Sequence, residues 1–302
     1  MENETPKREN ISEVIKKYKA ATAGQEQGVP NAITAALPKP PQFNAQEFEK
    51  KMSQETDPDL MTSYEIIKFP SQGMFYPSRI SEVSVEYMTS KDEDLLTTPS
   101  LIENGTVLDV LLRRKIKTPG ISPDELLSGD RNAVLLFLRT SSYGADYTVQ
   151  VTDPRTGIPF NEVVNLLQLK YKEPKELPDM YGHFTVDIPM RKKSVTIRLL
   201  SSGEENTLYK KAKAIQEAYG QEISEYSTMK LKAHVVAINE KTDRSYIDKF
   251  IDVMPALDAL TVRKKIMDVS PDVDMAYQFM AKDGYTFIAN LSVGVDFFFP
   301  GT

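Results

Sequence analysis

The chain has 302 residues, 40% of them hydrophobic, which is enough for about two domains with real cores. It has no cysteine and only two histidines, His183 and His234, which excludes disulfides, thiolate metal sites and a cysteine nucleophile and disfavours zinc. A net charge of −6 with interspersed signs disfavours nucleic acid as the main partner, and no apolar run is long enough to span a membrane, so we expect a soluble protein made in the cytoplasm.

Residues 1–60 differ in composition from the rest and predict an N-terminal arm. Four apolar residues at helical spacing predict a first short amphipathic helix: Ile11, Val14, Ile15 and Tyr18. A linker rich in Ala, Gly, Pro and Gln follows, and then a second short helix from Asn44 with Phe48 and Met52 on one face. Neither helix is long enough to be stable alone, so we expect the arm to dock on a partner; a disordered tail without a partner is the alternative.

Residues 61–175 predict a first α+β unit, because runs of alternating apolar residues are interspersed with runs at helical spacing. A charged, proline-containing stretch near 172–178 marks its end. The predicted elements are strands at 64–69 and 81–88, helices from Ser90, at 106–115 and from Asp130 to Gly144, and a hairpin turning at Asp153–Gly157.

Residues 176–302 predict a second α+β unit. Its predicted elements are a hairpin around the basic turn Arg191–Lys193, helices at 204–219, 226–238, 245–254 and 256–269, a hairpin turning at Lys282–Gly284, and a terminal strand. Three aromatic residues at the end of the chain are Phe297, Phe298 and Phe299. They either lock the terminal strand onto the core or mark a surface that a partner buries.

The two units repeat one pattern. In each, an alternating strand leads to a Ser or Thr cap with an acidic first turn, and later an apolar helix ends in an arginine before a hairpin with a Gly turn. The matching residues are Thr89 and Ser201, Arg139 and Arg263, and Gly157 and Gly284. We therefore predict an α+β fold of two related strand-helix-hairpin units with a flexible arm; chance similarity is the alternative.

Signatures of catalysis are missing. The chain has no Gly-rich phosphate loop, no His-Glu-x-x-His and no Gly-x-Ser-x-Gly, although carboxylate pairs made only in space would escape notice. Acidic runs at 92–94 and 204–205 are best explained as helix caps, and both histidines as ordinary surface or core residues. The basic turn Arg191–Lys193 is either a solvated hairpin tip or a contact for phosphate or an acidic partner. We predict no catalytic residue, no metal site and no cofactor.

Four groups of residues follow one another in a fixed order along the chain: Pro70, Ser71, Gly73 and Tyr76; Met88, Thr89 and Glu93; Arg139, Tyr143 and Gly144; and Phe299 and Pro300. In this order they resemble the baseplate hub protein family of T-even-like contractile-tailed bacteriophages. The resemblance covers residues 64–302 and rests on the order of motifs that are individually unspecific.

One departure from the family concerns metal. Many relatives carry a Cys-x-x-Cys knuckle at each of two turns, where this chain has Asp153–Gly157 and Ala281–Gly284. Thiolate metal at these corners is excluded here, so we expect backbone geometry at Pro154, Gly157 and Gly284 to hold the turns.

The resemblance implies a structural virion protein, an adaptor between the central hub or spike and neighbouring tail proteins. It implies partners among the hub or spike, the tube-initiating proteins and the tape measure, with several copies in each particle. Alternatives are an assembly factor absent from the finished virion and a peptidoglycan hydrolase of the hub. The residues predicted to bind partners are Ile11, Val14, Ile15, Tyr18, Phe43, Phe48, Phe297, Phe298 and Phe299.

Overall fold

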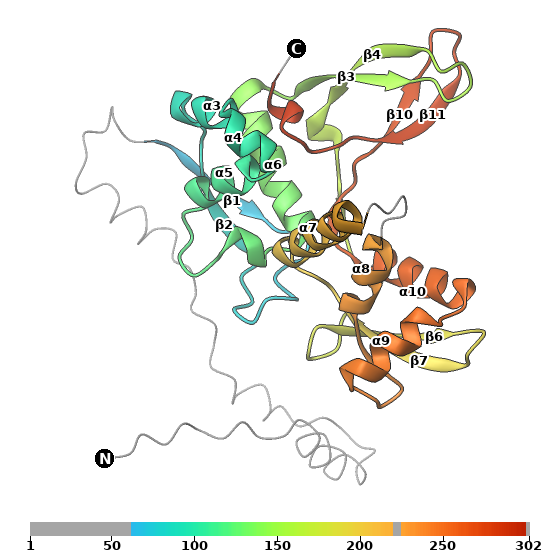
Figure 1. The fold of residues 1–302 in the computed structure, drawn as a ribbon. Coiled ribbons are helices and arrows are strands. Elements are labelled where there is room, and N and C mark those ends of the chain that lie inside the picture. The colour runs from blue at the N-terminus through green and yellow to red at the C-terminus, as the bar shows by residue number, and fades with distance from the viewer. Residues whose placement is uncertain (1–61, 220–224, 300–302) are drawn as a thin grey trace, which may run out of the picture. The chain divides into compact units, whose positions relative to one another are not determined.

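The computed structural model describes residues 62–219 and 225–299, and these residues belong to one compact unit. Helices and small antiparallel sheets alternate along them, which confirms the predicted α+β class (Figure 1). The predicted arm, residues 1–60, lies outside the described residues. The domain limits near residue 175 and the duplication stay predictions.

The first half places a group of helices between two antiparallel strand pairs. β1 pairs with β2, with Tyr64 opposite Glu86, and β3 pairs with β4, with Asp146 opposite Asn165. Each pair follows from alternating apolar residues. The elements are β1 (Tyr64–Lys68), β2 (Glu82–Glu86), α3 (Ser90–Leu96), α4 (Pro99–Glu103), α5 (Val107–Lys115), η2 (Pro123–Glu125), α6 (Ser128–Tyr143), β3 (Asp146–Thr152), β4 (Pro159–Asn165), η3 (Leu166–Gln168) and β5 (Tyr171–Lys172).

The second half contains a three-stranded antiparallel sheet, β6-β7-β8, and a hairpin, β10–β11. A short pairing of β5 with β9 connects it to the first half. The elements are β6 (His183–Ile188), β7 (Lys193–Arg198), α7 (Ser202–Tyr219), α8 (Tyr226–His234), β8 (Val235–Ile238), α9 (Arg244–Asp252), α10 (Ala256–Val269), β9 (Asp272–Val273), β10 (Ala276–Met280), β11 (Thr286–Asn290) and η4 (Asp296–Phe298).

Two expectations for the second half are wrong. The helix expected at 226–238 ends at His234, and Val235–Ile238 forms strand β8, because these mostly apolar residues pair with β7 and become buried. The expected terminal strand is the 3-10 turn η4. There, the amides of Phe297 and Phe298 donate to the carbonyls of Gly294 and Val295, so they are not available to a neighbouring strand.

The buried apolar side chains form two clusters. The first joins β1, β2, α3, α5 and α6 with residues from the end of the chain: Phe279, Leu291, Phe297 and Phe298. The second lies between the sheet β6-β7-β8 and helices α8, α9 and α10. The chain therefore builds one core, leaves it to build another, and returns to the first.

The loop Phe69–Pro77 is anchored through a buried tyrosine and aspartate. The hydroxyl of Tyr76 donates to Asp130 in the first turn of α6 and accepts from the amide of Leu127 at 2.9 Å. The amide of Ser71 donates to the other carboxylate oxygen of Asp130 at 2.9 Å. Burial raises the pKa of both Asp130 and Tyr76. The Pro-Ser-x-Gly-x-x-Tyr motif thus fixes the loop to the start of α6.

Reciprocal hydrogen bonds cap one helix in each half. The amide of Thr89 donates to Asp92 at 2.9 Å, and the amide of Ser201 donates to Glu204 at 2.9 Å. In return, the hydroxyl of Thr89 accepts from the main-chain amide of Asp92, and the hydroxyl of Ser201 accepts from that of Glu204. Each pair of bonds forms a capping box. These contacts confirm that acidic residues after Thr89 and Ser201 serve as helix caps.

Arg139 is fully buried and has no carboxylate partner within residues 62–219 and 225–299. Its guanidinium donates to three main-chain carbonyls, those of Phe297 at 2.8 Å, Gly144 at 2.9 Å and Asp146 at 3.3 Å. The rings of Tyr143 and Tyr147 lie 5.4 and 5.7 Å from it. Arg139 therefore joins the end of α6, the start of β3 and the C-terminal turn.

We expect Arg139→Lys to lower the free energy of unfolding by about 3 kcal/mol, because a lysine cannot reach all three carbonyls and leaves buried acceptors unpaired. Chemical denaturation of the full chain measures this. Arg113→Lys is the matched control: Arg113 is exposed and paired with Asp124, so it should change stability by less than about 0.5 kcal/mol. Equal effects of the two substitutions would contradict the proposed importance of Arg139.

Candidate protein-interaction sites

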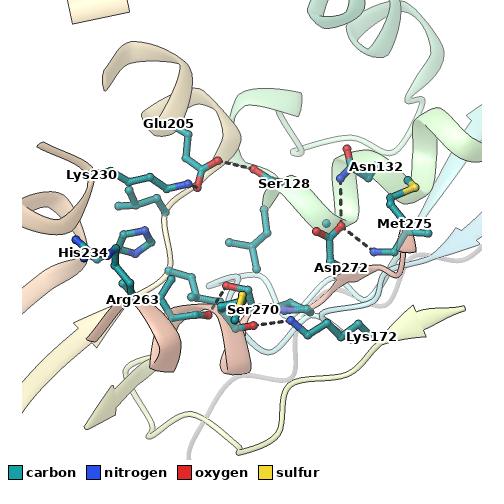
Figure 2. Close-up of a pocket in the computed structure, with 18 of the residues that line it drawn as sticks. Ser128, Asn132, Lys172, Glu205, Lys230, His234, Arg263, Ser270, Asp272 and Met275 are labelled. Carbon is teal, nitrogen blue, oxygen red and sulfur yellow. Dashed lines mark hydrogen bonds and ion pairs between the residues drawn. The ribbon is translucent and has the colours of Figure 1, made fainter. Parts of the chain in front are cut away.

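A cavity of about 690 Å³ lies where elements of the two clusters meet. Figure 2 shows Lys230 and His234 of α8 on one side and Asn132 of α6 with Asp272 of β9 on the other. Apolar residues from both halves complete the wall: Leu127, Leu199, Leu200, Leu231, Ile266 and Leu291. The lining is mixed apolar and polar, which suits a polypeptide segment or an amphipathic ligand.

Most charged groups in this cavity already have a partner. Lys230 pairs with Glu205 at 2.8 Å, and Glu205 also accepts from the hydroxyl of Ser128 at 2.9 Å. The ammonium of Lys172 donates to the carbonyl of Met267 at 2.5 Å. These contacts join α6, α7 and α8 and shape the wall.

His234 also lines the cavity, and one of its two ring nitrogens is unpaired among the described residues. Its Nδ1 lies 2.7 Å from the carbonyl of Arg198, which can only accept, so Nδ1 carries the proton. Nε2 is therefore an acceptor in the neutral ring, and it has no hydrogen-bond partner among the described residues. Burial lowers the pKa of His234, although its bond to Arg198 opposes the shift. The ring is held neutral at pH 7.

The cavity holds no arrangement that we can assign to catalysis. Two of its serines bond other groups, since Ser128 donates to Glu205 and Ser270 donates to the carbonyl of Ile266. Within residues 62–219 and 225–299, no group of three His, Asp or Glu side chains could hold a metal ion.

Two hairpins, β3–β4 and β10–β11, lie against each other. Phe160 and Phe287 pack edge to face with ring centroids 6.2 Å apart. At the turns, Arg155 pairs with Asp153 at 3.1 Å and with Asp283 at 2.7 Å, and it lies 3.7 Å from the centroid of the Tyr285 ring. The sequence prediction relied on backbone geometry at these turns and missed this ion-pair cluster.

Large apolar side chains are exposed at several places among the described residues, including Leu167, Leu177 and Met180, and two further groups of them lie on neighbouring elements. The first, here called the hairpin face, consists of Ile158, Val163, Met280 and Ile288 on the hairpins. The second, here called the α10 face, consists of Leu257, Leu260 and Met267 on α10 with Met190 and Val253 beside them. Exposed apolar groups of this size are typical of surfaces that partners cover.

The predicted partner-binding residues are distributed differently. Phe297 and Phe298 are buried in the first core, where the Phe297 ring packs on Tyr147, and Phe299 is partly buried against the same core. The other predicted residues all lie outside the described part of the chain: Ile11, Val14, Ile15, Tyr18, Phe43 and Phe48. Their role in partner binding stays a prediction.

The basic turn and the second histidine also have defined places. Arg191 donates to the carbonyl of Val253 at 2.6 Å and lies over the ring of Phe250, so it is engaged within the protein. Lys192 at the tip is exposed. His183 begins β6 and is partly buried.

These features are those of an α+β protein with two buried cores and groups of exposed apolar side chains. The family described as T4 bacteriophage base plate protein matches residues 61–279, and the chain belongs to this family. It is therefore a bacteriophage baseplate protein. No curated protein and no solved structure matches the chain. Among the described residues, no helix is both long and apolar enough to cross a membrane.

Because the pKa of His234 is lowered in the folded state, the unfolded chain binds more protons below about pH 6.5, and stability should fall as the pH drops below that value. We expect His234→Gln to remove this loss, since glutamine is not protonated there. Urea unfolding between pH 5 and 8 measures the free energy of unfolding over the range in which histidine titrates.

The control is His183→Gln, because His183 is the only other histidine. This variant should keep the pH dependence of the unsubstituted protein. If His183→Gln abolishes it and His234→Gln does not, the assignment of the buried neutral ring is wrong.

Proposed function

We propose that this baseplate protein is an adaptor of the baseplate hub, placed between the central hub or spike and neighbouring tail proteins during assembly. The observation that carries the proposal is the pair of separate exposed apolar surfaces, the hairpin face and the α10 face, on a chain of the base plate family. An adaptor must bind two neighbours at once, and this requires two surfaces that do not overlap.

The two faces belong to different cores. The hairpin face is carried by strands that pack on the first cluster, and the α10 face by a helix of the second. The cavity between them offers a further place for an inserted segment of a partner. We infer partners among the hub or spike, the tube-initiating proteins and the tape measure, and several copies in each particle.

The arm supplies a third contact in this proposal. Its apolar residues would fold onto a neighbour, so that buried apolar area offsets the loss of conformational entropy on ordering. The role is mechanical and involves no reaction. We infer that the protein is made in the host cytoplasm and remains in the tail of the virion.

We expect deletion of residues 1–60 to leave a folded, soluble protein that does not enter particles, because the described core residues lie after the deletion. Complementation of a phage that lacks the gene, followed by analysis of the particles, measures this. Circular dichroism and thermal unfolding of the shortened chain show whether it is folded.

A matched variant keeps the length of the arm and changes only its apolar side: Ile11, Val14 and Ile15 each to Ser. The control replaces Lys16 and Lys17 by Ser in the same segment. The triple apolar variant should impair incorporation and the lysine variant should not. Normal incorporation of the chain that lacks residues 1–60 would rule out the role of the arm.

Mass spectrometry of purified virions distinguishes an adaptor from an assembly factor. The adaptor is present in the finished particle and the factor is absent. A peptidoglycan zymogram of the purified protein tests the hydrolase alternative, for which the proposed function expects no clearing.

A further inference from the structure

The exposed side of α10 is apolar where a surface helix is ordinarily polar. Val262 and Val269 point into the second core, while Leu257, Leu260 and Met267 are 51%, 56% and 59% exposed. At 100° per residue these three lie on one face, opposite the buried valines. An amphipathic helix needs only one apolar side to join its own core, so the second apolar side is available to a partner.

Neighbouring residues extend this side into a surface. Asp258, buried at the first turn of α10, accepts from the amides of Met190 at 2.8 Å and Arg191 at 3.0 Å. The side chain of Arg191 in turn holds the carbonyl of Val253 at 2.6 Å. Met190 and Val253 are thereby fixed beside the N-terminal end of α10, and both are exposed. The α10 face is preformed, which lowers the entropy cost of docking.

The charges around the α10 face are mostly positive. Arg263 and Lys264 are exposed on α10 and have no ion pair among the described residues, and the same is true of Lys192 on the β6–β7 turn. The nearby carboxylates are already used, since Asp268 pairs with Lys175 and Glu176 with Lys265. The face therefore fits an apolar segment with acidic flanks.

Residues 43–60 of this chain have that chemistry. The segment contains apolar residues at intervals, and it has more acidic than basic side chains: Phe43, Phe48, Met52 and Leu60 against Glu47, Glu49, Glu55, Asp57 and Asp59, with only Lys50 and Lys51. It ends two residues before residue 62, where the described structure begins. Phe48 and Met52 are four residues apart, the spacing of two anchors on one side of a helix.

We propose that residues 43–60 of one copy dock on the α10 face of a second copy. The inference rests on the proposed function, in which the arm binds a neighbouring subunit, and it names the surface that receives the arm. One segment bound to a different surface of the next copy makes a head-to-tail contact, which generates a ring where the rotation closes. Several copies in a baseplate would be joined in this way.

The absence of cysteine from the chain provides a direct test. Full-length protein carrying Phe48→Cys is mixed with full-length protein of a different tag length carrying Leu260→Cys, and disulfide formation between them is followed on a gel. We expect this pair to form the mixed disulfide about tenfold faster than a control pair of Phe48→Cys with Gln150→Cys, because docking raises the local concentration of the two thiols. Gln150 is an exposed residue of β3, away from α10.

Charge gives a second readout with a matched control. Adding Lys264→Glu to the Leu260→Cys protein should slow the cross-link and remove most of its salt dependence, whereas Lys282→Glu, in the β10–β11 turn, should leave both unchanged. All four residues that are changed to Cys or Glu in the described part are exposed, and unfolding measurements on each variant verify that it is folded.

Two results would overturn the inference. One is equal cross-linking of Phe48→Cys with Leu260→Cys and with Gln150→Cys. The other is a Phe48→Cys/Leu260→Cys chain that closes only within itself at every concentration, since the contact would then lie within one copy. The cross-link is measured on purified protein, whereas the deletion of the arm is tested in particles. The docking of residues 43–60 on the α10 face and the proposed adaptor function can therefore fail independently. If deletion blocks assembly but no specific cross-link forms, the arm binds elsewhere and only this inference is lost.

Discussion

The fold depends on a buried cation whose hydrogen-bond partners in the described part of the chain are main-chain carbonyls. Arg139 donates to the main-chain carbonyls of Gly144, just after the end of α6, and Asp146, at the start of β3, and to that of Phe297 in the C-terminal turn, 158 residues away in sequence. A buried charge is costly unless every donor finds an acceptor, and backbone carbonyls supply these only when the segments are correctly placed. Arg139 thus makes the position of the chain end a condition for stability of the first core.

The halves are also held by contacts that admit no side chain. A Cβ added to Gly129 in the first turn of α6 would lie 2.1 Å from the carbonyl oxygen of Pro271, and one added to Gly203 in α7 would lie 2.7 Å from that of Asp124. Each glycine therefore lets the start of a helix in one half approach the backbone of the other. The amide of Ser202 uses this proximity to donate to the carbonyl of Leu126 at 2.7 Å. The walls of the cavity in Figure 2 are positioned by these approaches.

Local patterns in the sequence predict most elements, because they depend on neighbouring residues alone. Alternation in Tyr147–Val151 and capping at Thr89 and Ser201 need no knowledge of the rest of the chain. The strand Val235–Ile238 was missed because a continuous apolar run fits a helix end as well as a buried strand, and only the open edge of β7 decides. The sequence did not predict the cavity or the α10 face for a related reason. Which side of an apolar helix is buried depends on residues that are distant in sequence.

The turns of the two paired hairpins are held by an arginine and two aspartates in place of the cysteines that the resemblance implies in relatives. The resemblance implies cysteine knuckles at these two turns in relatives, and in this chain the turns lie together with Arg155 between Asp153 and Asp283. The arginine lowers the pKa of both carboxylates through hydrogen bonds, and its contact with Tyr285 adds a second hold. The pair of Arg155 with Asp283 is exposed, so salt weakens it, and it contributes little to stability. The deeper packing of Phe160 on Phe287 must then set the geometry of the hairpin face, and the turns only restrain it.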